Sequence, residues 1–247
     1  MNILALIPAR MGSSRFPGKP MAKILGKPMI GHVYEKVSKS PFLKLTAVAT
    51  CDKEIYDYII SIGGIAVMTK DIYERASDRC AEALLKLENQ DLKFDIVLMV
   101  QGDEPMIHPN MIEEALQPMI DDPTIKVLNL YGVINDISEF EDRNCIKVVT
   151  DLNNNALYFS REPIPTRFKG VENEMKKQVC VIPFRRDYLL EYTQLKPTPL
   201  EIAESIDMIR VLEHGMKVKM VQTNYYSQSV DTIEDLKKVE NFMQISQ

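Results

Sequence analysis

The chain has 247 residues, of which 45% are hydrophobic and 26% are charged, and these values are typical of a globular protein with a sizeable core. The net charge of −5 and the pI of about 5.4 disfavour a nucleic-acid partner, which usually requires a basic face. A small anionic substrate is still compatible with this charge, because a local basic loop can exist in an acidic protein.

The sequence also disfavours a membrane protein and a disulfide-rich or metal-rich one. The four cysteines form no C-x-x-C motif, so we interpret them as core or incidental thiols in a reducing compartment. No apolar run approaches the roughly 18 residues of a spanning helix. The apolar opening is too short for a signal peptide and is interrupted by Pro8 and Arg10. We therefore expect a cytoplasmic protein without a membrane partner.

Strands and helices alternate in the first half of the chain. The expected strands are 3–7, 45–50, 65–68 and 95–100, and the expected helices are 28–37, 53–62 and 75–87. Such alternation indicates a parallel sheet with helices on both faces. Ligands bind beyond the carboxyl ends of the strands in sheets of this kind, so we expect the functional groups in the loops that follow them.

The second half contains more strands and a hairpin signal. The expected strands are 127–134, 147–151, 156–160, 178–184 and 217–222, and the expected helices are 199–215 and 232–243. A turn at Asn153–Asn155 joins two of these strands into a hairpin, and 163–177 has the composition of a loop. We predict one α/β domain over 1–247, with a Rossmann-like, mostly parallel sheet flanked by helices and a smaller β-rich lobe at 147–222.

The loop after the first strand has the composition of a polyanion site. Its polar side chains include Arg10, Ser13, Ser14, Arg15 and Lys19, and two glycines let the backbone bend. Guanidinium and ammonium groups neutralise phosphate oxygens, and glycines let main-chain N–H groups approach closely. The loop is not a Walker motif, since Pro20 stands where that motif has Ser or Thr.

Two acids are candidate metal ligands. Asp103 follows a buried strand within V-Q-G-D-E-P, where a carboxylate can hold magnesium near phosphates or can simply cap a turn. Asp231 lies in S-V-D-T-I-E-D-L, immediately before a predicted helix, where Asp is also a favoured N-cap. We expect these two carboxylates, from distant strands, to meet at the carboxyl edge of the sheet.

These motifs together resemble a known family. The opening I-P-A-R-x-x-S-S-R-x-P-G-K-P, the V-Q-G-D-E-P segment and A-L-Y-F-S-R-E-P-I-P at 156–165 are similar to the sugar-acid cytidylyltransferases, above all those that activate Kdo. The resemblance runs along almost the whole chain. It implies the fold of nucleotide-diphospho-sugar transferases, a magnesium-dependent transfer of CMP from CTP to a 2-keto-3-deoxy sugar acid, a role in lipopolysaccharide or other cell-surface polysaccharide synthesis, and a homodimer.

The resemblance also implies a division of roles. The catalytic residues would be Arg10, Lys19, Asp103 and Asp231, with Asp103 and Asp231 holding Mg²⁺. The nucleotide would contact Pro8, Ala9, Arg10, Ser13, Arg15, Lys19, Asp78 and Arg79. The acceptor would contact Gln101, Arg161, Gln178 and Asp207. For Arg161, a planar guanidinium suits the planar carboxylate of a sugar acid.

Two segments depart from the family pattern. Where the family has T-x-x-x-H-x-S-G-T-D-R, residues 69–79 read T-K-D-I-Y-E-R-A-S-D-R. Where it has H-x-G-x-Y and E-S-L-E-Q-L-R, this chain has Q-V-C-V-I at 178–182 and E-S-I-D-M-I-R at 204–210. In the family the first segment helps to enclose the nucleotide, so its contacts are altered or displaced here. At the second, the family's His, Tyr and Gln face the sugar and are lost here. The basic loop and the two acids of the donor side are kept, and the acceptor side is altered. Unpaired buried polar groups cost about 1–3 kcal/mol each, so we expect the acceptor to differ or to be held differently.

Other functions stay open at this stage. The acceptor could be a nonulosonic acid, although relatives of that kind open with A-R-x-G-S-K, which this chain lacks. An amino-sugar acid or a phosphorylated small molecule is a further alternative. A glycosyltransferase of the same fold would carry D-x-D at its metal site, whereas this chain reads Gly102-Asp103-Glu104. A non-catalytic nucleotide-binding relative would keep the basic loop without turnover.

Overall fold

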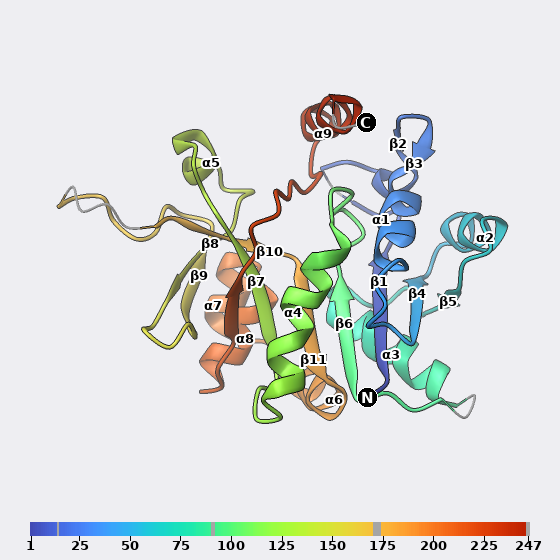
Figure 1. The fold of residues 1–247 in the computed structure, drawn as a ribbon, viewed down its shortest axis with the longest axis horizontal. Helices are drawn as coiled ribbons and strands as arrows, with labels where there is room; N and C mark the ends of the chain where they lie inside the picture. The colour runs from blue at the N-terminus through green and yellow to red at the C-terminus, as the bar shows by residue number, and fades with distance from the viewer. Residues whose placement is uncertain (14, 90–91, 170–173, 246–247) are drawn as a thin grey trace.

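The computed structural model describes residues 1–13, 15–89, 92–169 and 174–245. Its first sheet has the strand order β11-β6-β1-β4-β5 (Figure 1). The strands are β1 (Ile3–Ala9), β4 (Leu45–Thr50), β5 (Ala66–Met68), β6 (Ile96–Val100) and β11 (Val181–Arg185). β1 pairs in parallel with β4 and β6, β4 pairs in parallel with β5, and only β11 runs antiparallel to its neighbour. The predicted mostly parallel sheet is confirmed.

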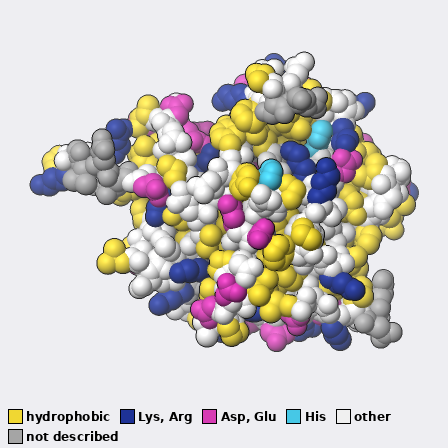
Figure 2. Space-filling view, in the orientation of Figure 1, with side chains coloured by type: hydrophobic (Ala, Val, Ile, Leu, Met, Phe, Trp, Pro, Cys, Tyr) yellow, Lys and Arg dark blue, Asp and Glu magenta, His cyan; other side chains and the backbone are white. Residues whose placement is uncertain are grey.

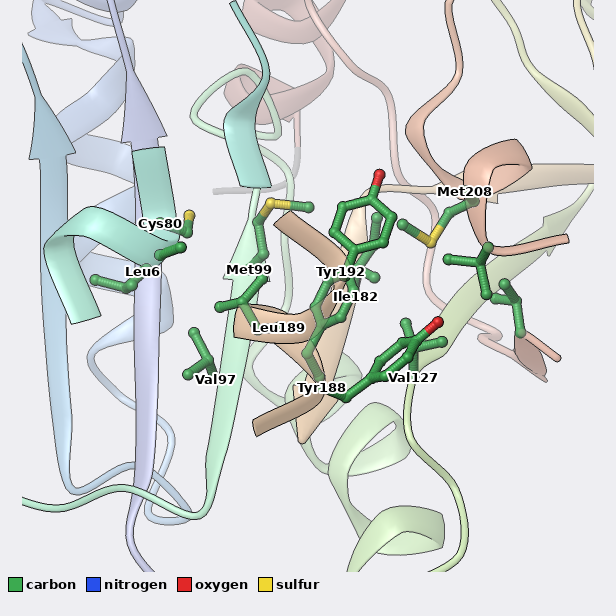
Figure 3. Packing of buried hydrophobic residues seen from close by; sticks show 14 of the residues in the cluster. Leu6, Cys80, Val97, Met99, Val127, Ile182, Tyr188, Leu189, Tyr192 and Met208 are labelled. Atoms are coloured by element: carbon green, nitrogen blue, oxygen red, sulfur yellow. The ribbon is translucent and has the colours of Figure 1, made fainter. Parts of the chain in front are cut away.

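Helices cover both faces of this sheet. Along β1, Leu4 and Leu6 belong to one apolar core and Ile3, Ala5 and Ile7 to the other, as expected for a strand buried on both faces. One core includes residues of α1 (Met29–Val37), α2 (Lys53–Ser61) and α4 (Pro109–Asp121). The other includes residues of α3 (Ala76–Glu88), α6 (Arg186–Gln194) and α8 (Asp207–Glu213), and Figure 3 shows side chains of α6 meeting those of β6 and β11 there.

A second sheet continues from the edge of the first. Its order is β12-β7-β10-β8-β9, and its strands are β7 (Leu128–Val133), β8 (Lys147–Thr150), β9 (Ala156–Ser160), β10 (Lys176–Val179) and β12 (Lys219–Gln222). A bridge between Val127 and Phe184 joins the two sheets where β7 begins beside β11. The hairpin predicted around the asparagine turn is present as the antiparallel pair β8–β9.

The second sheet does not coincide with the lobe that we predicted at 147–222. β7 belongs to it but precedes this range, and β11 lies within the range but pairs with the first sheet. The cause is the segment 178–184, which we predicted as one strand. The structure divides it at Cys180 into β10 and β11, and each half pairs with a different sheet.

Other element predictions need correction. Three helices lie where we predict none: α4, α5 (Ile137–Glu141) and α6. The helix predicted at 199–215 is two helices, α7 (Pro199–Glu204) and α8, because Ser205 between them adopts a left-handed conformation with φ of 55°. Such a φ cannot continue a right-handed helix.

The carboxyl edge of the first sheet carries the loops of interest. After β1 the chain enters the basic loop, a short 3₁₀ turn at Lys19–Met21, and the small hairpin of β2 (Lys23–Ile24) and β3 (Lys27–Pro28). The last helix, α9 (Ile233–Ile245), lies beyond this edge beside that hairpin in Figure 1. Figure 2 shows basic and acidic side chains intermixed on one face of the molecule. Within the described residues, no helix is long and apolar enough to cross a membrane.

Candidate active site

The basic loop is folded back on itself at the end of β1. The Met11 amide donates to Asp52 Oδ2 at 2.8 Å, and Asp52 follows the neighbouring strand β4. The Gly18 amide donates to the Met11 carbonyl at 3.0 Å, with Gly18 at a φ of 73° that favours glycine. These bonds close the loop and direct Lys19 toward the end of β6.

Lys19 joins the two predicted metal acids. Its Nζ donates to Asp103 Oδ2 at 2.7 Å and to Asp231 Oδ1 at 3.2 Å. Arg15 Nη2 donates to the same oxygen of Asp231 at 3.0 Å, and Arg15 Nη1 donates to Asn144. Burial lowers the pKa of Lys19, but the two carboxylates outweigh it and raise the pKa above its ordinary value. Four of the predicted site residues therefore form one charged cluster.

Asp231 reaches this cluster from a loop rather than from a strand end, which corrects our expectation. β12 ends at Gln222, and the chain then crosses to the first sheet, where the Val230 amide donates to the Asp103 carbonyl at 2.9 Å. The helix start that follows is held by another acid, since Asp235 Oδ2 accepts from the Thr232 amide at 2.9 Å. The Asp231 carboxylate faces Lys19 and Arg15 instead of serving as an N-cap.

A small separate core fixes α9 and thereby Asp231. Its buried members are Ile24, Met29, Met106, Val230 and Val239. Glu240 of α9 also accepts from the Leu25 amide at 2.7 Å. The second acid is therefore placed by packing between the C-terminal helix and the β2–β3 hairpin.

Gly102 brings the Asp103 loop against the end of β1. A Cβ on Gly102 would lie 3.0 Å from the Pro8 carbonyl oxygen, 3.2 Å from Ile30 Cδ1 and 3.5 Å from Ala9 Cβ. This approach is closer than a larger residue permits without movement of the backbone. Pro8 and Ala9, predicted to line the nucleoside pocket, are buried here at the end of β1.

The other predicted nucleotide contacts lie apart from the cluster. Arg10 is exposed and makes no ion pair with any residue that the structure describes. The Ser13 hydroxyl accepts from the Phe16 amide at 3.3 Å, so it also stabilises the loop. Asp78 is half-buried in the first turn of α3, and burial raises its pKa even though Arg210 and Arg75 oppose the shift.

Arg79, which we predicted as a nucleotide contact, lies inside the protein. Its side chain is buried, and it donates to Thr69 Oγ1 at 2.6 Å and to the carbonyls of Lys70 and Tyr73 at 3.3 Å. It therefore holds the loop before α3 from inside the protein. Its partners here are one side chain and two main-chain carbonyls of that loop.

Arg161 is bonded to the main chain. Its Nε donates to the Glu204 carbonyl at 2.7 Å, its Nη1 to the Arg143 carbonyl at 3.0 Å and its Nη2 to the Ser205 carbonyl at 3.4 Å. These bonds hold the junction between α7 and α8. Because a guanidinium has five N–H groups, the side chain keeps donors for a carboxylate ligand.

The three remaining acceptor candidates differ in their surroundings. Gln101 is half-buried after β6, and its side chain has no hydrogen-bond partner among the described residues. The Gln178 amide donates to the side chain of Asn129. Asp207 begins α8, where Arg75 Nη1 donates to its Oδ1 at 2.9 Å.

Comparison with known proteins identifies the family. The sequence pattern of the cytidylyltransferases matches residues 4–233. The chain belongs to this family. A 3-deoxy-manno-octulosonate cytidylyltransferase of Geobacter metallireducens is 41% identical over 97% of this chain and 96% of its own length. The corresponding protein of Geotalea uraniireducens is 42% identical over 97% of this chain and 98% of its own length.

Solved structures agree with this assignment. The structure of a CMP:2-keto-3-deoxy-manno-octonic acid synthetase complexed with CTP covers 100% of both chains, with a TM-score of 0.91 and 37% identity. The 4-diphosphocytidyl-2C-methyl-D-erythritol synthase of Anaerococcus prevotii shares the fold, with a TM-score of 0.63 and 16% identity. The family resemblance and the fold class expected from the sequence are confirmed.

The acids of this cytidylyltransferase have the donor set that magnesium prefers. Asp103 and Asp231 both bond the Lys19 ammonium, so their carboxylates lie close enough to share one cation. Magnesium is usually held by one or two carboxylates together with substrate phosphates. Among the described residues, no group of three or more His, Cys, Asp or Glu could hold a metal by itself.

Sequence reasoning missed one buried acid of the site. Glu104 is 4% exposed, and its Oε2 accepts from the Ser227 hydroxyl at 2.5 Å. Burial, with the nearby charge of Asp103, raises the pKa of Glu104 to about 7. This carboxyl ties the Asp103 loop to the segment that leads to Asp231. The V-Q-G-D-E-P motif contained it, but only the fold shows that it points inward.

Proposed function

We propose that this cytidylyltransferase transfers CMP from CTP to a 2-keto-3-deoxy sugar acid, Kdo or a Kdo-like acid, with release of pyrophosphate. The observation that carries the proposal is the convergence of Lys19, Asp103 and Asp231 at the carboxyl edge of the sheet. The relatives at about 40% identity, which carry the name 3-deoxy-manno-octulosonate cytidylyltransferase, support the sugar acid as acceptor.

The residues at this edge would position the reaction rather than take part in it covalently. Lys19, Arg15 and Arg10 would neutralise the phosphate oxygens of CTP, and the loop that Asp52 closes would keep them in place. The acceptor hydroxyl oxygen bonds to the α-phosphorus as the bond from that phosphorus to the bridging oxygen breaks. Pyrophosphate leaves, and the hydroxyl proton is released.

Asp103 and Asp231 would hold magnesium, which supplies positive charge next to the phosphate oxygens when it is bound. Lys19 contacts both acids, so phosphate binding would draw its ammonium toward the new negative charge and free carboxylate oxygens. Gln101 and Arg161 would face the acceptor. The side-chain amide of Gln101 has no hydrogen-bond partner among the described residues, and Arg161 keeps N–H groups that its main-chain bonds do not use.

The proposal is tested by pyrophosphate release with each of the four nucleoside triphosphates, with and without Mg²⁺, across a panel of sugar acids. We expect turnover with CTP alone, with Kdo or a Kdo-like acid, and loss of turnover when EDTA removes the metal. Lys19→Met should lower kcat/KM about 100-fold or more, because positioned charge at a reacting group is typically worth that factor.

A matched control is Lys53→Met on α2, where the lysine side chain is 82% exposed and its one ion pair among the described residues is with Asp57. This variant should keep the activity of the wild type. The proposal would be refuted by an enzyme that binds CTP yet turns over none of the sugar acids, or by equal turnover with all four nucleotides.

A further inference from the structure

Arg75 and Asp207 form a half-buried ion pair that joins the start of α3 to the start of α8. Arg75 immediately precedes α3, and its Nη1 donates to Asp207 Oδ1 at 2.9 Å across 132 positions of sequence. Its Nε lies 3.7 Å from Glu201 Oε1, and the Ser77 hydroxyl donates to Asp207 Oδ2 at 3.4 Å. The side chains of Arg75 and Asp207 are 25% and 18% exposed, so solvent screens this pair less than a surface pair.

Both partners stand where this chain departs from the family pattern. Arg75 replaces the serine of S-G-T-D-R, and Asp207 replaces the second glutamate of E-S-L-E-Q-L-R. The two departures, which look unrelated in the sequence, therefore contact each other in the fold. In this chain the two positions are joined by one ion pair.

Asp207 and the two predicted metal acids act on the same thiol, that of Cys180. Burial raises the pKa of the Cys180 thiol well above its ordinary value, and the negative charges of Glu104, Asp103, Asp231 and Asp207 raise it further. Asp207 is also two residues from Ser205, whose carbonyl accepts from the predicted acceptor contact Arg161. The Cys180 carbonyl also accepts from the Gln101 amide at 3.2 Å, so the main chain of Cys180 lies beside that of a predicted acceptor contact.

The backbone that carries Asp207 is held from two sides. Arg161 bonds the carbonyls of Glu204 and Ser205 at the junction of α7 and α8, and Arg75 bonds the carboxylate two residues later. Tyr192 donates to the Asp207 carbonyl at 2.9 Å. Asp207 therefore has a fixed position. Arg75 is bonded directly to its carboxylate, and the positive charge of Arg210 acts on it as well.

We propose that Arg75 is a positioning residue for the acceptor, because it neutralises and orients the Asp207 carboxylate so that an anionic sugar acid can bind beside it. An unneutralised carboxylate there would repel the acceptor's own carboxylate. Held by Arg75, the same group accepts hydrogen bonds from the hydroxyl groups of the sugar. This inference rests on the proposed function, since it assigns a role in acceptor binding.

The test compares Arg75→Ala, Asp207→Asn and the double variant in steady-state kinetics with CTP and the sugar acid that the wild type uses. Arg75→Ala should raise the KM for the sugar acid about 10-fold or more and leave the KM for CTP within about 2-fold. Addition of Asp207→Asn should restore much of the loss, because no unneutralised carboxylate then remains. Arg75→Lys should fall between Arg75→Ala and the wild type, since it keeps the charge without the planar fork.

Lys53→Ala, which removes one exposed positive charge on α2, is the matched control, and thermal melts establish that each variant is folded. The inference is overturned if folded Arg75→Ala and Arg75→Lys keep the wild-type KM for the acceptor. It is also overturned if the double variant is no better than Arg75→Ala, or if the KM values for CTP and acceptor rise together. Failure of the wild type to use any sugar acid would instead refute the proposed function, and this role with it.

Discussion

The ion pair of Arg210 and Glu201 gives the clearest test of what holds α7 and α8 together. The guanidinium donates to both carboxylate oxygens, at 2.7 and 2.8 Å, and the two side chains are 4% and 0% exposed. Glu201 also accepts from the Thr198 amide at 3.1 Å, which caps α7. Removal of one partner from such a pair leaves a buried charge without compensation, which typically costs 3–5 kcal/mol.

Glu201→Gln should therefore lower the free energy of unfolding by about 3–5 kcal/mol, because the amide keeps the shape and the Thr198 bond but leaves Arg210 charged. At about 2–4 °C per kcal/mol for a chain of this size, the melting temperature should fall by roughly 10 °C. Since the chain has no Trp, urea unfolding is followed by circular dichroism. Glu201→Leu combined with Arg210→Met should cost much less than Glu201→Gln alone.

The exposed pair of Lys53 and Asp57 on α2 is the matched control. Its side chains are 82% and 55% exposed, so Asp57→Asn should change the free energy of unfolding by less than about 0.5 kcal/mol. The reasoning would be refuted if Glu201→Gln also cost less than about 1 kcal/mol, or if the apolar double variant were the least stable of the set.

Two further predictions concern other parts of the chain. Gly102→Ala should lower kcat at least 10-fold with little change in melting temperature. The reason is that a Cβ 3.0 Å from the Pro8 carbonyl oxygen displaces the loop that carries Asp103. Wild-type kinetics in this variant would contradict the reasoning. The hydrogen bonds from Arg186 lower the pKa of Glu88 below its ordinary value of 4.5. The ionised Glu88 therefore stabilises the folded state fully above pH 4.5, and this contribution to the free energy of unfolding is lost as the pH falls through the lowered pKa. Glu88→Gln should therefore flatten the loss of stability below about pH 4.5 in urea unfolding, and an unchanged slope would argue against the pair.

The sequence predicts the four parallel strands of the first sheet and the loops that follow them well, because both signals are local. Buried strands such as Ile96–Val100 are short apolar runs, and Asp103 follows one of them directly. Parallel topology then places the ends of β1, β4 and β6 at one edge without further information. The approach of Lys19 to Asp103 could therefore be expected from the chain alone.

Other features depend on contacts between distant segments. Nothing near Arg79 in sequence shows that its guanidinium is buried against Thr69. Likewise, nothing near Arg75 shows that its guanidinium bonds the carboxylate of Asp207. The apolar residues of α4 recur at helical spacing, but Pro118 inside the helix weakens the helical signal in the sequence. At the break at Ser205, the carbonyl accepts a hydrogen bond from Arg161, 44 positions earlier in the chain, which no local rule predicts.

The division between β10 and β11 at Cys180 restricts how the length of the chain can change. Val179 is in register with Leu130 in the second sheet, and Val181 with Val100 in the first, so a single residue spans the two sheets. Because side chains alternate between faces, one inserted or deleted residue here would turn every side chain of one strand to the opposite face. Substitutions can therefore accumulate around Cys180, whereas insertions and deletions cannot. New acceptor specificity has to arise there by exchange of side chains on a backbone of constant length.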